Sequence, residues 1–216
     1  MTIVAPSAAV DRSVHFAPPP TWATRYAFAA CDDTLYVPNY LAEPAVWTDV
    51  LFERLDWGEE SIRLFGRSIV VPRLSVCYGD DGIEYRYSNV THRARGWPDA
   101  LRTLREQLHR RVGMRFNFVL ANLYRDGRDS MGWHADDERE LGARPVVASI
   151  SLGAPRTFRL RARDGSGRRA SVLLESGSLL LMWGRSQLRW QHALPKVRGD
   201  VGLRINLTFR DVQSSA

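Results

Sequence analysis

A histidine and an aspartate two residues apart, with a second histidine far downstream, are the side chains of this sequence best suited to chemistry. They are His134, Asp136 and His192. Residues i and i+2 of a β-strand point to the same side, so the first two can bind one ion together. Two imidazoles and one carboxylate form the facial triad that holds non-heme Fe(II) and leaves coordination positions open. The spacing predicts a ferrous site, although the His-x-Asp tripeptide alone is a weak signal.

A segment near the C-terminus, residues 204–210, alternates polar and apolar side chains with the period of a β-strand. Its polar face carries Arg204, Asn206, Thr208 and Arg210. Two guanidinium groups on such a face indicate an anion site held against a core. Zn(II) takes the same ligands and would support hydrolysis. A hydrolase does not need a second fixed anion site, so the segment favours iron.

The composition is that of a folded protein with a basic surface. The chain has 216 residues, of which 44% are hydrophobic, enough for one domain of the larger kind. Lys and Arg number 30 against 24 Asp and Glu, and Lys196 is the single lysine. A basic balance favours polyanionic partners such as nucleic acid. An arginine-rich genome would give the same balance, so charge alone is weak support.

Cysteine usage and hydropathy indicate where the protein works. Cys31 and Cys77 are too few for a disulfide framework, which fits a reducing compartment. The sequence has neither an apolar run of membrane length nor a secretory signal. We therefore expect a soluble, cytoplasmic protein without membrane contact, and a monomer.

The periodicity changes along the chain from helical to strand-like. Residues 1–21 form a Pro- and Ala-rich arm, whereas residues 43–57 and 97–112 have apolar side chains at helical spacing. From residue 115 the period is two, and Gly-containing turns separate short segments. The expected strands are residues 116–124, 146–151, 157–163, 171–174, 179–183 and 204–210. Many short strands with regular turns predict an antiparallel sandwich or jelly roll.

Several motifs together resemble one known family. They are Asn122–Tyr124, Asp129–Glu138, Ser149–Gly153, His192 and Arg204–Arg210. In these motifs the chain is similar to the AlkB-type oxidative demethylases, which depend on Fe(II), 2-oxoglutarate and O2. The likeness runs from about Leu64 to Arg210 and is nearest to the branch that repairs duplex DNA.

The resemblance implies a mainly β (α+β) fold, a double-stranded β-helix with N-terminal helices buttressing one sheet and a nucleotide-recognition lid. The expected division is a flexible arm (1–21), helices and lid (22–114) and a catalytic core (115–212). Residues 22–212 would together form one dioxygenase domain.

The resemblance also implies roles for the metal and co-substrate residues. His134, Asp136 and His192 would bind the iron. Arg204 would pair with the distal carboxylate of 2-oxoglutarate, and Arg210 would lie near the carboxylate beside the metal. The remaining co-substrate residues would be Asn122, Tyr124, Asn206 and Thr208. From the residues alone, Asn122 and Tyr124 are better explained as a satisfied polar spot in the core.

For the substrate, the resemblance implies an alkylated base such as 1-methyladenine or 3-methylcytosine in DNA, and potentially in RNA. The base would be flipped out of the helix and stacked on aromatic side chains. The nucleotide-recognition residues would be Tyr85, Arg86 and Tyr87. Asp137 and Glu138 would accept hydrogen bonds from an exocyclic amine. Phe65, Gly66 and Arg67 would belong to a finger that fills the gap left by the base, although from the residues alone Phe65 is better explained as an ordinary core residue.

The reaction implied is hydroxylation of the methyl group, release of formaldehyde and conversion of 2-oxoglutarate to succinate. One strand face carries several arginines that could face phosphates, and a solvated sheet face explains them equally well. They are Arg159, Arg161 and Arg163, together with Arg168 and Arg169.

Two alternatives remain from the sequence. One is an oxygenase of the same kind that acts on a protein or a small molecule. The other is an inactive nucleic-acid-binding relative, which the complete set of ligands and arginines disfavours.

Overall fold

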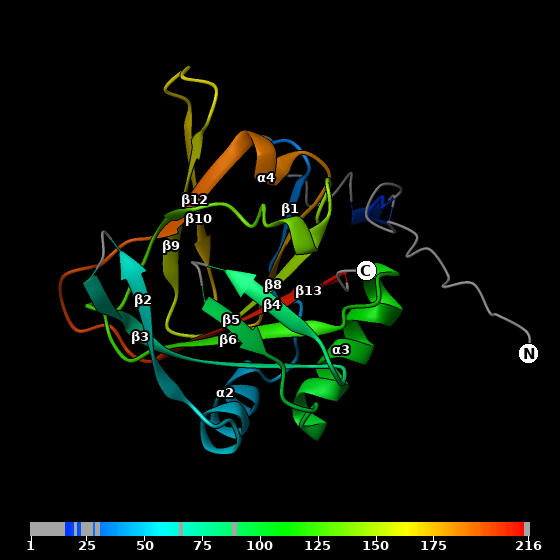
Figure 1. Cartoon of the computed structure of the whole chain (residues 1–216), viewed down its shortest axis with the longest axis vertical. Coiled ribbons are helices and arrows are strands. Elements are labelled where there is room, and N and C mark those ends of the chain that lie inside the picture. The colour runs from blue at the N-terminus through cyan, green and yellow to red at the C-terminus, as the bar shows by residue number, and fades with distance from the viewer. Residues whose placement is uncertain are drawn as a thin grey trace, which may run out of the picture.

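Two antiparallel sheets form the body of the protein, which we describe from a computed structural model (Figure 1). The structure describes residues 16–19, 21–22, 28, 31–64, 67–87 and 90–213. The large sheet contains, in spatial order, β1 (Thr34–Val37), β11 (Ser178–Met182), β8 (Val147–Gly153), β13 (Arg204–Arg210), β6 (Phe118–Tyr124), β3 (Arg67–Gly79) and β2 (Gly58–Leu64). The small sheet contains β10 (Arg169–Leu174), β9 (Arg156–Ala162), β12 (Trp190–Leu194) and β7 (Met131–His134). This arrangement is the expected jelly roll.

Two helices cover the outer face of the large sheet, α2 (Pro44–Arg54) and α3 (Asp99–Val112) (Figure 1). Both were predicted from helical spacing, and α3 ends where Gly113 takes a left-handed conformation with φ of 77°. Leu51 of α2 and the apolar stripe of α3 pack in one core with the sheet. Their burial explains why an otherwise charged helix such as α3 is held in place.

The strand β13 shows how the two faces of the large sheet differ. Ile205, Leu207 and Phe209 pack in the core shared with the helices. Because side chains alternate along a strand, the even-numbered residues of β13 point the other way, toward the small sheet. The polar face predicted from the sequence is therefore an interior face between the sheets.

Several elements were not predicted from periodicity. In the first half of the chain these are β1, β2, β3 and a separate hairpin of β4 (Glu84–Tyr87) and β5 (Val90–Arg93). In the second half they are β7, β12 and a short helix α4 (Ser186–Arg189). The large sheet thus draws strands from both sides of residue 115, and the division of the chain at that position stays a prediction.

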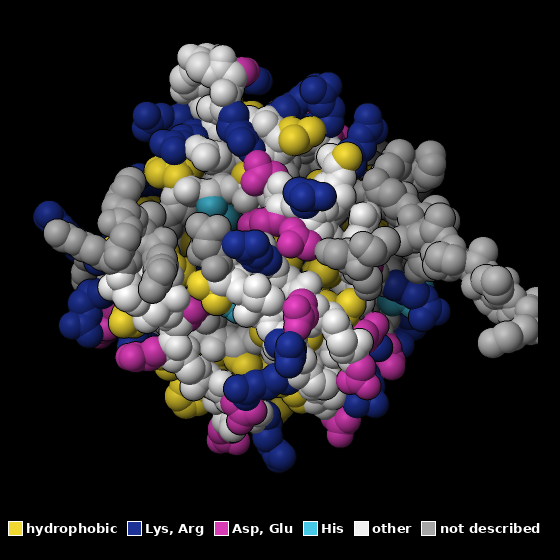
Figure 2. All heavy atoms as spheres, in the orientation of Figure 1, with side chains coloured by type: hydrophobic (Ala, Val, Ile, Leu, Met, Phe, Trp, Pro, Cys, Tyr) yellow, Lys and Arg dark blue, Asp and Glu magenta, His cyan; other side chains and the backbone are white. Residues whose placement is uncertain are grey.

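The surface separates by charge. Figure 2 shows Lys and Arg side chains gathered over the end of the molecule where β9, β10 and α4 lie, whereas acidic and basic side chains alternate over α2 and α3. Among the described residues, no helix is long and apolar enough to cross a bilayer.

Candidate metal and co-substrate site

The three predicted metal ligands come together between the sheets. His134 at the end of β7 and His192 on β12 are direct cross-strand partners. Their Nε2 atoms lie 3.0 Å apart. Asp136 follows β7 by two residues, and one potential ligand atom from each of the three side chains lies within 4.8 Å of the others. Two neighbouring strands of the small sheet and the segment that follows β7 therefore build the cluster, and the expectation that Asp136 lies on the same strand as His134 is wrong.

The protonation states of the cluster suit a metal. Burial lowers the pKa of His134, and burial together with His134 lowers the pKa of His192 to about 3. Burial would raise the pKa of Asp136, but Arg210 and the two histidines outweigh it and hold this pKa at about 2. Neutral imidazoles and an ionised carboxylate are the forms that bind a divalent ion.

Neighbouring groups orient these ligands. The Nδ1–H of His134 donates to the Gly132 carbonyl at 2.9 Å, which turns Nε2 toward the cluster. Arg210 donates from Nη2 to Asp136 Oδ1 at 2.9 Å, and both side chains are buried. The backbone N–H of Asp136 donates to Oε1 of Gln187 on α4 at 3.0 Å. Sequence reasoning missed Gln187, because no spacing rule links it to the ligands.

A narrow cavity of about 40 Å³ adjoins the cluster and is lined by side chains of both sheets. At its wall Arg204 is 2% exposed, donates from Nη2 to Ser151 Oγ at 2.9 Å, and lies with its guanidinium carbon 5.1 Å from the Tyr124 ring centre. Its Nε has no hydrogen-bond partner among the described residues. Burial lowers the pKa of Arg204 to about 10. A buried cation with an unused donor calls for an anion.

The other polar residues of this cavity are joined in short networks. Thr208 Oγ1 donates to Asn206 Oδ1 at 3.2 Å, and Asn206 Nδ2 donates to Ser149 Oγ at 2.8 Å. Asn122 Oδ1 accepts from Arg73 Nε at 2.7 Å. Arg73 was missed in the sequence because β3 was not predicted, and the structure makes it a buried partner of a predicted residue.

A second cavity of about 350 Å³ opens on the other side of the cluster. Tyr85 and Tyr87 of β4 line it together with Arg73, Trp133 and Glu138. The Tyr85 hydroxyl donates to Glu138 Oε2 at 2.6 Å, and burial raises the pKa of Glu138. The metal residues His134 and Asp136 form part of the same wall, so the two cavities meet at the cluster.

Not every predicted substrate residue reaches this cavity. Arg86 is exposed and lies on the opposite face of β4 from the two tyrosines. Asp137 is exposed and pairs with Arg163, with Oδ2 and Nη1 2.5 Å apart, because the chain turns outward after Asp136. Phe65, Gly66 and the side chain of Arg67 lie outside the described residues.

Comparisons with known proteins agree with this geometry. Residues 33–210 match the family model described as the 2OG-Fe(II) oxygenase superfamily. The chain is 39% identical to "DNA oxidative demethylase ALKBH2" of Bos taurus over 158 residues, covering 70% of this chain and 57% of that protein. It is 41% identical to "Alpha-ketoglutarate-dependent dioxygenase alkB homolog 3" of Homo sapiens over 150 residues, covering 65% and 52%. The chain thus spans little more than half the length of these relatives.

The solved structure titled "The structure of OsALKBH1" superposes with a TM-score of 0.56 at 18% identity, covering 83% of this chain and 96% of that one, which shows a shared fold. The family match, the AlkB-type relatives and the His-Asp-His cluster lead to one conclusion: this chain belongs to the 2OG-Fe(II) oxygenase superfamily, as an AlkB-type member of a family that uses Fe(II), 2-oxoglutarate and O2.

Proposed function

We propose that this protein is an Fe(II)- and 2-oxoglutarate-dependent dioxygenase that removes methyl groups from alkylated bases in DNA. The observation that carries the proposal is the pair of cavities that meet at the His-Asp-His cluster, one ending at a buried arginine and the other walled by aromatic side chains. The relatives named as a DNA oxidative demethylase and an alpha-ketoglutarate-dependent dioxygenase support the same activity.

The residues present fit the metal and the co-substrate. Three ligands of mixed nitrogen and oxygen type suit Fe(II) and leave positions free. The unused Nε of Arg204 offers a charge-assisted hydrogen bond to the distal carboxylate of 2-oxoglutarate. Asn122 and Tyr124 line the same cavity and would hydrogen-bond the co-substrate, and Asn206 and Thr208 of the neighbouring strand line it too.

Each protein group has a separate task in this scheme. When bound, Fe(II) with 2-oxoglutarate and O2 supplies the oxidising power to hydroxylate a methyl group, and 2-oxoglutarate becomes succinate and CO2. Arg210 holds the Asp136 carboxylate in place through their buried ion pair. The hydroxymethyl group then leaves the ring nitrogen as formaldehyde.

The base would be held by the wall of the larger cavity. Tyr85 and Tyr87 offer aromatic faces for a flipped base, and Glu138 offers a carboxyl oxygen to an exocyclic amine. That amine is present in both 1-methyladenine and 3-methylcytosine. The basic end of the molecule seen in Figure 2 suits a polyanion.

We also propose that the protein works as a monomer in the cytoplasm. Cys31 and Cys77 are free thiols, which supports a reducing compartment.

The test supplies an oligonucleotide carrying 1-methyladenine or 3-methylcytosine with Fe(II), 2-oxoglutarate and ascorbate, and measures formaldehyde and the restored base. We expect turnover by the wild type and none by His134→Ala, which should still bind DNA. Running single-stranded and duplex substrates with Phe65→Ala tests the finger predicted at that position. Consumption of 2-oxoglutarate that methylated oligonucleotides do not stimulate would instead indicate a protein or small-molecule substrate.

A further inference from the structure

A cluster of partly buried polar side chains lies behind the larger cavity, where β2, β3 and the β4–β5 hairpin meet. Glu60 of β2 is at its centre, and its Oε2 accepts hydrogen bonds from Tyr87 Oη and Ser75 Oγ, both at 2.9 Å. The other oxygen, Oε1, lies 3.3 Å from Nε2 of His92 on β5. Strands from two separate sheets are thus joined by one carboxylate.

Glu60 lies beside an irregularity in the pairing of β2 and β3. The pairing of β2 with β3 shifts register between Glu59 and Ser61, where β3 has two residues more than β2, so Glu60 lies opposite a bulge in β3. Its side chain is 10% exposed, whereas Glu59 beside it is exposed to solvent. Burying a carboxylate costs free energy unless it is paired. Burial would raise the pKa of Glu60, but the contacts with His92, Ser75 and Tyr87 outweigh it and lower this pKa.

The cluster reaches the larger cavity through Tyr87. Glu60 and His92 do not line that cavity, but Tyr87 does. Its ring stacks on His92 with 4.7 Å between ring centres and an interplanar angle of 20°. Its hydroxyl is held from behind by Glu60 and also accepts from Arg73 Nη2 at 3.1 Å. The ring is therefore held by Glu60 and His92 from outside the cavity whose wall it forms, and by Arg73 within that wall.

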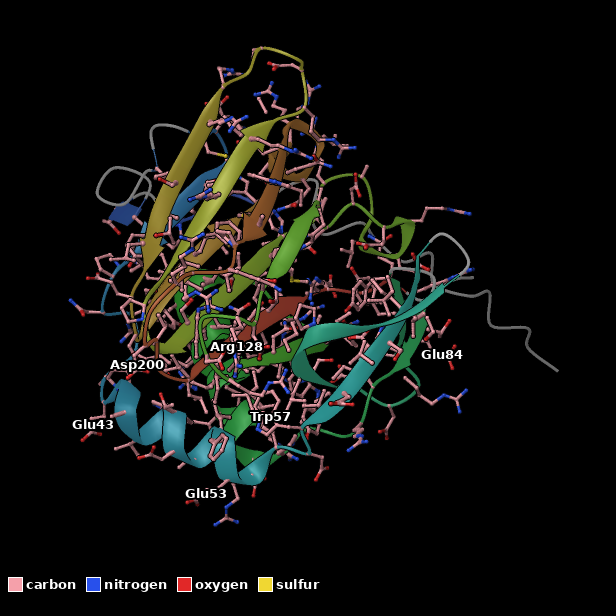
Figure 3. The ribbon with its side chains drawn as sticks, turned by 90° about the vertical axis from the view of Figure 1, so that its left-hand side faces the viewer. Glu43, Glu53, Trp57, Glu84, Arg128 and Asp200 are labelled. Atoms are coloured by element: carbon pink, nitrogen blue, oxygen red, sulfur yellow. The ribbon has the colours of Figure 1, made fainter. Side chains whose placement is uncertain are left out.

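The β4–β5 hairpin depends on such side-chain contacts because it belongs to neither the large nor the small sheet. β4 and β5 pair only with each other as strands. At its base the hairpin continues into Arg95, which exchanges backbone hydrogen bonds with Gly79 and Cys77 of β3. In Figure 3, β2 and β3 run beside the hairpin that Glu84 marks. Toward its far end, the Glu60 cluster connects the hairpin to the body.

We propose that Glu60 and His92 are positioning residues that dock the β4–β5 hairpin and thereby set Tyr87 for binding of the flipped base. The proposal rests on the proposed function above. Glu60 touches neither the cluster of metal residues nor the cavity. It should therefore control the affinity for the nucleic acid and leave the chemical step unchanged.

The experiment compares steady-state kinetics of Glu60→Ala, Glu60→Gln and Tyr87→Phe on a methylated oligonucleotide. Glu59→Gln is the matched control, because it removes a neighbouring carboxylate that is exposed. For Glu60→Ala we expect KM for the oligonucleotide to rise about tenfold, the loss of one hydrogen bond to a charged group, with kcat little changed. Glu60→Gln keeps an acceptor for Tyr87 and should recover most of the affinity. Combining Glu60→Ala with Tyr87→Phe should add little to either single effect.

A second measurement does not depend on turnover. Hydrogen exchange of the free protein should become faster in the peptide covering residues 83–95 of Glu60→Ala and stay unchanged in Glu59→Gln. If hydrogen exchange becomes faster throughout the Glu60→Ala protein, that variant is destabilised as a whole. Glu60→Gln then tests the positioning role, by its KM for the oligonucleotide and by the exchange of residues 83–95.

Two results would overturn the positioning role: an unchanged KM with active wild-type protein, or a fall in kcat at constant KM. If the wild type does not turn over the oligonucleotide, the proposed function has failed. Docking of the hairpin by Glu60 is then tested by hydrogen exchange alone. Equal exchange of residues 83–95 in Glu60→Ala and in the wild type would show that Glu60 does not dock the hairpin.

Discussion

Arg204 offers a sharp test of the co-substrate assignment, because the same side chain should oppose folding and favour binding. Its guanidinium is buried between the sheets with Nε unpartnered among the described residues. Replacing it with methionine removes the charge while keeping most of the side-chain length. We expect Arg204→Met to be more stable than the wild type without ligand and insensitive to 2-oxoglutarate.

The magnitude follows from the perturbed pKa. Burial moves the pKa of Arg204 from 12.5 to about 10, which corresponds to a cost of about 3 kcal/mol for the charged form at neutral pH. The substitution also leaves Ser151 Oγ without its donor, which lowers the free energy of unfolding of the variant by about 1 kcal/mol. The free energy of unfolding should therefore rise by about 2 kcal/mol in Arg204→Met. Because the folded protein loses this proton at lower pH than the unfolded chain, the difference should shrink as pH rises from 10 toward 12.5.

The assay is denaturant unfolding of both proteins with and without 2-oxoglutarate, with Mn(II) in place of Fe(II) to prevent turnover. Wild-type protein should gain about 2.7 kcal/mol at a ligand concentration of 100 times Kd, and Arg204→Met should gain nothing. A variant that is several kcal/mol less stable than the wild type, or one that 2-oxoglutarate still stabilises, would refute the reasoning.

The other predictions concern the metal, the core and the substrate cavity. Asp136→Asn should lose metal-dependent thermal stabilisation, because a neutral amide replaces the anionic ligand beside Arg210; retained metal binding by titration would contradict this. Arg156→Leu should lower the free energy of unfolding by about 3 to 5 kcal/mol, because it strands the carbonyls of Asp126, Asp129 and Pro195. Arg128→Ala is its exposed control (labelled in Figure 3) and should leave the unfolding midpoint unchanged. Glu138→Gln should raise KM for a methylated oligonucleotide, because Glu138 lines the cavity. Asp137→Asn should leave KM unchanged, because Asp137 faces Arg163 outside the cavity. Equal effects of the two variants would mean that the turn after Asp136 rearranges on binding.

Residue types and short spacings were sufficient to predict the three members of the His-Asp-His cluster. The His-x-Asp pair and the distant histidine identified the members of the cluster by their ligand types, although Asp136 lies beyond the end of β7. The strand period of two correctly placed the polar residues of β13 on one face. The helices α2 and α3 were also predictable, since their apolar residues recur at helical spacing and Gly113 marks the end of α3.

Long-range pairing decided the rest. Nothing in the sequence places Gln187 behind Asp136 or Arg73 beside Asn122, because these contacts join strands and a helix far apart in the chain. Asp137 and Arg86 were expected to face the substrate, but the outward turn after Asp136 and the alternation of β4 direct them away from the cavity. Glu60 lies opposite a bulge in β3 and accepts from Tyr87 of a separate sheet, a contact that no periodicity reveals. Residue types and local spacing establish which groups are available for chemistry, whereas packing between distant segments establishes which of them meet.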